Sequence, residues 1–397
     1  NNGSSETDLA ALTNKTNAAV SYTADIRESS SAFLAYQPKS SSPWVTGTNF
    51  ETAKTFFKTV TATNAVSAAE VQANVDTIAS NSSNTTTSDT AFTLTTGVDE
   101  PTLTYTKFDA SLNTSGQMTL GSLDKLSGTT ATTDTLNATI NKSVTPASLS
   151  GIEIVNIASE TNASTFGLIN AADVTKVNAG GSSSDLTLSG LGKATVISIS
   201  DSQSAHTITF NDVSGSSDSA ELTLAQVTGV ATVTLGGVET LAITSSGGES
   251  SNSIDLTAGD LETATVTGSG DLTLAALDGG DGTEGLSKLD ASGMSGKLNV
   301  TTGGQVGIGN SDLTVLGGSG NDTLNVAGHT TSEISVDGGA GNDVITIVLA
   351  ADDTVAGGAG TDTLSTSINL STAGNVTGIE ALTLSGAVTQ DMDFLSD

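Results

Sequence analysis

After residue 90, short segments of the sequence alternate apolar residues with threonine at a period of two. Such alternation is typical of β-strands that bury one face and expose the other. Turn-forming Gly, Ser, Asn and Asp residues separate these segments at short intervals. The pattern therefore predicts many short strands, of which the clearest are 92–94, 186–188, 208–210, 222–224, 233–235, 272–274 and 382–384.

A short phrase of glycine, a β-branched apolar residue and glutamate recurs between these segments. It stands at Gly151-Ile152-Glu153, at Gly237-Val238-Glu239 and at Gly378-Ile379-Glu380. Recurrence without a fixed period indicates stacked but unequal turns, as in an irregular parallel β-solenoid or β-roll. A β-sandwich is the alternative, because short alternating strands do not by themselves fix a topology.

The first 90 residues follow a different pattern. Thr48-Asn49-Phe50-Glu51 and Ser67-Ala68-Ala69-Glu70 match the helix capping box, and helically spaced apolar residues follow each of them. A polar stretch over 80–90 then reads as a linker. We therefore expect a partly helical N-terminal domain over 1–90 with an anchoring or assembly role, an irregular β-solenoid over 91–300, and a β-roll with a C-terminal cap over 301–397.

Composition narrows the classes of function. The chain has 12 Lys and Arg against 43 Asp and Glu, a net charge of −31, which argues against nucleic acid as a partner. It has no cysteine, and its two histidines, His206 and His329, stand apart from any plausible nucleophile, so we expect no enzyme. No stretch approaches the roughly 18 apolar residues of a membrane span, and no transmembrane segment is predicted.

The strongest motif lies in the last hundred residues. The pattern G-G-x-G-x-D-x-U, with U apolar, occurs at 317–324, 338–345 and 357–364. The starts are 21 and 19 residues apart, which places the three loops on the same edge of successive turns. The candidate metal ligands, by side chain or carbonyl oxygen, are Gly317, Ser319, Asn321, Asp322, Gly338, Ala340, Asn342, Asp343, Gly357, Ala359, Thr361 and Asp362.

The residue types suit a hard cation. Glycines let carbonyl oxygens turn inward, and the aspartates supply carboxylates to the gaps between turns. Carbonyl-rich, flexible loops fit the six to eight oxygen ligands of Ca²⁺ better than the stricter shell of Mg²⁺. Three loops make two gaps, one between Asp322 and Asp343 and one between Asp343 and Asp362. After Lys297 the sequence holds twelve acids and no Lys or Arg, so we expect folding of this region to depend on metal.

These three loops resemble the nonapeptide repeats of the RTX family of secreted calcium-binding proteins, and the match is close over 317–365. The Thr-rich region 91–300 resembles, more loosely, the RTX proteins that form bacterial surface layers. The resemblance implies type I secretion, folding outside the cell on meeting calcium, and assembly into a lattice at the cell surface. It also implies an N-terminal domain that anchors to lipopolysaccharide or a surface glycan.

The hypothesis that joins these observations is a non-enzymatic, extracellular structural protein that self-assembles with Ca²⁺ into a surface layer or a related assembly. Two other classes stay open. One is an RTX adhesin fragment that binds a surface or a glycan, which would remain monomeric with calcium. The other is the C-terminal part of a type I-secreted hydrolase, which would need a catalytic domain elsewhere in its gene.

Overall fold

The computed structural model describes residues 3–28, 48–81, 91–101, 105–129, 132–192, 194–228, 231–247, 251–279, 285–302, 312–329, 333–367 and 375–384. The chain divides into two compact units, Asn1–Thr90 and Ala91–Asp397. Each unit has its own hydrophobic core. No helix in these ranges is both long enough and apolar enough to cross a membrane.

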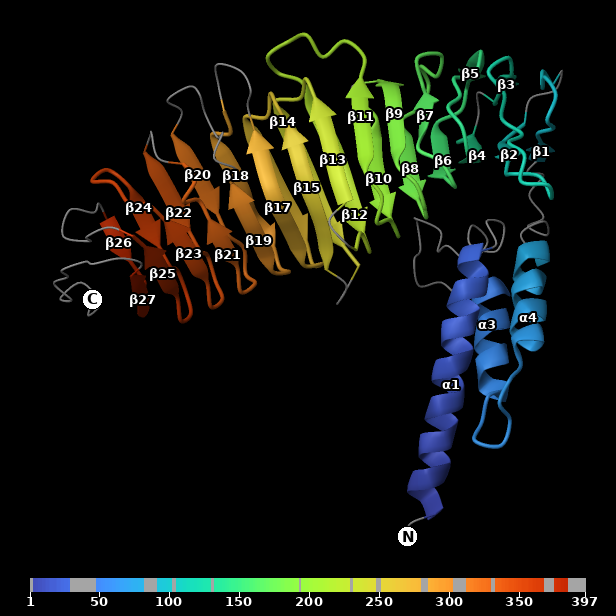
Figure 1. Cartoon of the computed structure of the whole chain (residues 1–397), viewed down its shortest axis with the longest axis horizontal. Helices are drawn as coiled ribbons and strands as arrows, with labels where there is room; N and C mark the ends of the chain where they lie inside the picture. Colours follow the sequence, from blue (N-terminus) through green and yellow to red (C-terminus); the bar gives the residue numbers. More distant parts are fainter. Residues whose placement is uncertain are drawn as a thin grey trace. The chain divides into compact units, whose positions relative to one another are not determined.

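The first unit is helical, with α1 (Gly3–Glu28), α3 (Thr48–Thr59) and α4 (Ala68–Asn81) (Figure 1). The predicted capping box at Ser67 is confirmed: the backbone N–H of Ser67 donates to the Glu70 carboxylate at 2.8 Å, and the Glu70 N–H donates to Ser67 Oγ at 3.3 Å. The side chains of the other predicted box, at Thr48, lie outside the described residues, although α3 begins there. Tyr22 of α1 packs on Phe57 of α3, with ring centroids 5.0 Å apart.

The second unit is a parallel β-solenoid, which confirms the predicted fold class. Within the described ranges its first sheet has 14 strands. In spatial order they are β1 (Ala91–Thr93), β2 (Lys107–Ala110), β4 (Thr135–Ile140), β6 (Ile154–Ser159), β8 (Lys176–Gly180), β10 (Val196–Ser200), β12 (Ser219–Ala225), β14 (Thr240–Ser246), β16 (Thr263–Gly268), β18 (Lys288–Met294), β20 (Leu313–Leu316), β22 (Ile334–Asp337), β24 (Thr354–Ala356) and β26 (Asn375–Thr377).

In the part of the chain that the structure describes, the second sheet has 11 strands and a small third sheet has two. The second sheet contains β7 (Ser164–Gly167), β9 (Leu186–Leu191), β11 (His206–Phe210), β13 (Ala231–Gly236), β15 (Asn252–Ala258), β17 (Leu272–Gly279), β19 (Leu298–Thr302), β21 (Thr323–Asn325), β23 (Val344–Ile347), β25 (Thr363–Thr366) and β27 (Ala381–Leu384). The third sheet pairs β3 (Lys125–Ser127) with β5 (Ser148–Ser150).

At the start of the solenoid β1 pairs with β2. From β2 on, the first sheet pairs even-numbered strands with one another, and from β7 on the second sheet pairs odd-numbered strands, so the chain alternates between the two sheets. Neighbouring strands are parallel, as β12 and β14 are, with Leu222 beside Ile243. An antiparallel sandwich, the alternative that the sequence left open, is therefore wrong. Both sheets continue across residue 300: β18 pairs with β20 in the first sheet, and β17 pairs with β19 and β19 with β21 in the second.

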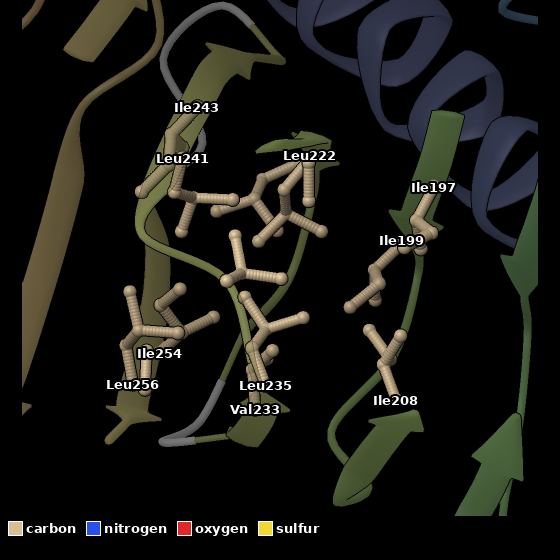
Figure 2. Close-up of a cluster of buried hydrophobic side chains, with 14 of the residues drawn as sticks. Ile197, Ile199, Ile208, Leu222, Val233, Leu235, Leu241, Ile243, Ile254 and Leu256 are labelled. Atoms are coloured by element: carbon tan, nitrogen blue, oxygen red, sulfur yellow. The ribbon is translucent and has the colours of Figure 1, made fainter. Parts of the chain in front are cut away.

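The core follows from the period of two in the sequence. In β12 the buried residues alternate with exposed or half-buried ones, and Ala220, Leu222 and Leu224 face inward. Figure 2 shows side chains of both sheets meeting between the strands, among them Leu241 and Ile243 from β14 and Ile254 and Leu256 from β15. Each turn thus buries a thin apolar layer on the turns above and below it, and the stack is the stable unit.

Candidate functional site

The three GGxGxD loops lie at one edge of the solenoid, each leading into a strand of the second sheet. Asp322, Asp343 and Asp362 directly precede β21, β23 and β25. These strands pair in register, with Thr323 beside Val344 and Val344 beside Thr363. The spacing of the motifs in the sequence therefore corresponds to a stack in space, in which the loops occupy the same corner of consecutive turns.

The loop backbones contact one another directly. Ala340 N–H donates to Gly318 C=O at 2.9 Å, and Ala359 N–H donates to Gly339 C=O at 2.8 Å. The fifth positions of the motif also connect the turns. The side-chain oxygen of Asn321 accepts from the Asn342 N–H at 2.8 Å, and that of Asn342 accepts from the Thr361 N–H at 2.9 Å. Ser319, Asn321 and Thr361 are exposed at this corner.

The motif aspartates form a line of carboxylates, termed the carboxylate column, that comprises Asp322, Asp343, Asp362 and Glu380. One oxygen of each accepts a backbone N–H from the turn before. Asp322 Oδ1 accepts from Leu298, Asp343 Oδ1 from Asp322, and Asp362 Oδ1 from Asp343, at 2.7, 2.7 and 2.8 Å. Glu380 Oε2 accepts from Asp362 at 2.7 Å. These bonds set the register of the column from turn to turn.

The aspartates of the column differ in the hydrogen bonding of their second carboxylate oxygen, Oδ2. Asp322 Oδ2 accepts the Gly318 N–H of its own loop at 2.8 Å. Asp343 Oδ2 and Asp362 Oδ2 are buried, and no residue in the described part of the chain donates a hydrogen bond to either. The two side chains are 1% and 0% exposed, so they are shielded from bulk solvent. A buried carboxylate oxygen without a donor is costly, and a cation is one way to satisfy it.

Loop conformation explains this difference. In the second loop Gly339 has φ +94°, and its N–H donates to Asp337 Oδ1 at 3.0 Å instead of to the motif aspartate. Gly358 occupies the same position in the third loop and has φ +101°. Gly318 in the first loop lacks this left-handed conformation, and its N–H reaches Asp322. Glycine is needed where φ is positive, because other L residues are strained there.

The unpartnered oxygens face carbonyl oxygens of the next turn. A methyl group built on Gly338 would lie 2.6 Å from Asp343 Oδ2 and 2.4 Å from Gly357 O. One built on Gly357 would lie 2.7 Å from Asp362 Oδ2 and 1.8 Å from Gly378 O. Each gap therefore brings together one carboxylate and one carbonyl oxygen, and both are ligands that Ca²⁺ takes.

The electrostatics of the column also indicates a site for a cation at the motif aspartates. Burial raises the pKa of Asp343 to about 6. The N–H of Asp322 opposes this shift, whereas the carboxylates of Asp322, Asp362 and Asp337 add to it. Burial also raises the pKa of Asp322, against the N–H groups of Leu298 and Gly318 that bond it. The ionised column is thus unfavourable by itself, and a bound cation would remove that cost.

Side chains alone do not make a metal centre here. Within the described ranges, no three Asp, Glu, His or Cys side chains lie close enough together to hold an ion. The column has one carboxylate per turn, so any cation needs backbone carbonyls to complete its shell. Glycine-rich loops supply such carbonyls, and the residues present therefore fit a hard oxygen-seeking ion such as Ca²⁺.

The opposite edge offers a useful contrast. Asp353 precedes β24 and is 1% exposed, like the motif aspartates. Both of its oxygens are hydrogen-bonded, Oδ1 to the Ile334 N–H at 2.9 Å and Oδ2 to the Ala350 N–H at 2.6 Å. A buried aspartate at a solenoid corner can thus be satisfied by backbone alone, and Asp343 and Asp362 differ from it in the missing second donor.

One member of the column, Glu380, is not among the residues that the motif spacing predicts. It belongs to the recurring Gly-apolar-Glu phrase, and the other two copies make the same contact. Glu153 accepts the Asp134 N–H at 2.7 Å, and Glu239 accepts the Asp218 N–H at 2.6 Å. The recurrence of the phrase ahead of a strand is the signal that could have identified the role of Glu380.

Comparison with family models, with curated proteins and with solved structures finds no significant match to this chain.

Proposed function

We propose that this chain is a non-enzymatic, extracellular structural protein whose stacked GGxGxD loops bind Ca²⁺ and whose solenoid self-assembles into a surface layer or a related cell-surface lattice. The observation that carries the proposal is the pair of buried, unpartnered carboxylate oxygens on Asp343 and Asp362 in a stack of glycine-rich loops. Divalent cations would neutralise the column and cross-link successive turns, so folding of this region would depend on calcium.

Self-assembly draws support from the ends of the two sheets. Among the described strands, β1 and β26 are the terminal strands of the first sheet and β27 is a terminal strand of the second, each paired on one side only. An unpaired parallel strand is a template for pairing with another chain. The strongly acidic composition favours assembly in which divalent cations screen the repulsion between copies.

The proposal extends to partners and location, on the strength of the sequence resemblance. The helical unit would anchor the assembly to lipopolysaccharide or a surface glycan, and the chain would leave the cell by type I secretion and fold outside it. Calcium outside the cell would then serve as the signal for folding.

The test is a calcium titration of the purified chain, followed by circular dichroism and by electron microscopy of the same samples. The proposal expects a gain of β signal on adding millimolar Ca²⁺, its reversal by excess EDTA, and sheets or filaments in the calcium-loaded samples. Mg²⁺ at the same concentration should be less effective. A chain equally folded in EDTA would contradict the calcium role, and a folded chain that stays monomeric with Ca²⁺ would contradict self-assembly.

A further inference from the structure

We infer that the carboxylate column holds an ion in a gap that no GGxGxD motif marks, between the loop 357–362 and the turn Gly378-Ile379-Glu380. The inference rests on the proposed calcium binding and moves its sites by one turn towards the C-terminus. The two occupied gaps are then those between the loops at 338 and 357 and between the loop at 357 and the turn at 378.

The position of each Oδ2 atom assigns it to a gap. Each motif aspartate directs this oxygen towards the first glycine of its own loop and the carbonyl of the equivalent residue one turn on. Asp322 Oδ2 therefore faces the first gap, Asp343 Oδ2 the second and Asp362 Oδ2 the third. The three gaps then differ in whether this Oδ2 atom has a hydrogen-bond donor.

In the first gap the oxygen is already satisfied, because Gly318 N–H donates to Asp322 Oδ2 at 2.8 Å. In the second and third gaps the Oδ2 atoms of Asp343 and Asp362 have no donor among the residues that the structure describes. Spacing in the sequence assigns ions to the first and second gaps. The hydrogen bonds favour the second and third.

The third gap brings together oxygens of three residues, Asp362, Gly378 and Glu380. Gly378 O and Asp362 Oδ2 converge on the Cα of Gly357, at 1.8 and 2.7 Å from the position that a methyl group on Gly357 would take. Glu380 brings a second carboxylate, held in place because its Oε2 accepts the Asp362 N–H and its own N–H donates to Asp362 C=O at 3.0 Å. Glu380 is exposed, so an ion could enter from solvent at this end of the column.

The other two Gly-apolar-Glu turns show that the Asp–Glu pair alone is not a metal site. Asp134 and Asp218 make the same N–H bond to Glu153 and Glu239. Their Oδ2 atoms, however, have donors: the Thr129 N–H for Asp134 and the Gly215 N–H for Asp218. Among the three copies, only the copy at 378 faces an unpartnered carboxylate oxygen. This difference singles out the third gap.

The experiment counts calcium ions bound by the full chain, using isothermal titration calorimetry on wild type and four single variants. We expect two ions for wild type, one for Glu380→Gln, and one for Asp343→Asn. Asp362 borders both gaps, because its Oδ1 accepts the Asp343 N–H and its Oδ2 faces the third gap, so Asp362→Asn should weaken both sites at least tenfold. Asp322→Asn should keep two ions, whereas sites in the first and second gaps would make it lose one.

Glu153→Gln is the matched control, because it removes the same carboxylate from the same kind of turn and should leave two ions. Glu380→Asp, which keeps the charge on a shorter side chain, separates loss of a ligand from loss of folding: it should retain two ions with a weaker second affinity. Two ions in Glu380→Gln and one in Asp322→Asn would overturn the inference and leave the proposed function intact. No calcium bound by wild type would overturn both.

Discussion

The backbone N–H of Asp343 donates a hydrogen bond of 2.8 Å to Oδ1 of Asp362, one turn further along the solenoid. This bond fixes one carboxylate oxygen of Asp362 and leaves the other, Oδ2, buried without a donor. Asp343 accepts from Asp322 in the same way and has the same unpartnered Oδ2. The geometry of the column is thus set by backbone bonds, which leave the Oδ2 atoms of Asp343 and Asp362 without a donor among the described residues.

Asp343→Asn should stabilise the calcium-free protein. The raised pKa of Asp343, about 6, means that the ionised side chain opposes folding at neutral pH. Asparagine keeps an oxygen for the Asp322 N–H and removes the charge, for a gain on the order of 1–2 kcal/mol. Urea unfolding in EDTA at pH 7.5 measures this gain, and addition of Ca²⁺ should stabilise the variant less than wild type.

Asp353→Asn is the control for that change. Both Asp353 oxygens accept backbone N–H groups, so the amide replaces an acceptor with a donor and should cost about 1 kcal/mol with or without calcium. Equal destabilisation of the calcium-free protein by the two variants would show that both oxygens of Asp343 are hydrogen-bonded, as those of Asp353 are. Asp343 Oδ2 would then not need a cation to compensate it.

Gly357→Ala should strongly destabilise the stack. Its methyl group would lie 1.8 Å from Gly378 O, a backbone atom that cannot move without displacing the next turn. We expect a loss of roughly 2 kcal/mol or more in the free energy of unfolding. Gly236→Ala in β13 is the comparison, because nothing lies within 4 Å of its added methyl group. Similar losses of stability in both variants would mean that the turns at 357 and 378 do not approach each other as closely as described.

His206 should make the solenoid sensitive to acid. It is 1% exposed, and its Nδ1 has no hydrogen-bond partner among the described residues. Burial lowers its pKa to about 4, and the Asp185 carboxylate opposes the shift. The neutral ring therefore favours folding above the unfolded pKa of about 6.5, and this stability is lost as the pH falls towards 4.

His206→Leu removes that dependence. Leucine matches the apolar partners of His206 in the neighbouring strands, Leu186 and Val233. Thermal unfolding between pH 7.5 and 4.5 should show that the stability of the variant relative to wild type increases as the pH falls, by a few kcal/mol at most. Parallel pH profiles of the two proteins would refute the buried, neutral histidine.

The fold could be predicted because burial of one strand face requires alternation, and Thr between apolar residues shows it directly at Leu222 and Leu224. No apolar pattern within residues 3–28 predicted the helix α1. Its buried positions are Ala18, Tyr22 and Ile26, which share a face at intervals of four, and the small Ala18 weakens the apolar signal.

The location of the site could also be predicted, because equal spacing of GGxGxD motifs by about one turn implies stacking. The sequence could not predict which carboxylate oxygens lack hydrogen-bond donors. That depends on whether a loop glycine has positive φ, as Gly339 has and Gly318 has not, and all three loops carry the same glycines. The contact of Glu380 with Asp362 likewise depends on the three-dimensional path of a turn outside the motif.

The most direct measurement is a crystal structure of the full chain grown with Ca²⁺, and with Tb³⁺ in its place to locate ions by anomalous scattering. We predict ions about 2.3–2.6 Å from the Oδ2 atoms of Asp343 and Asp362, in the two gaps that Gly357 O and Gly378 O face. Well-ordered loops with no anomalous peak at this corner, and with both Oδ2 atoms hydrogen-bonded to protein or water, would contradict calcium binding by the column.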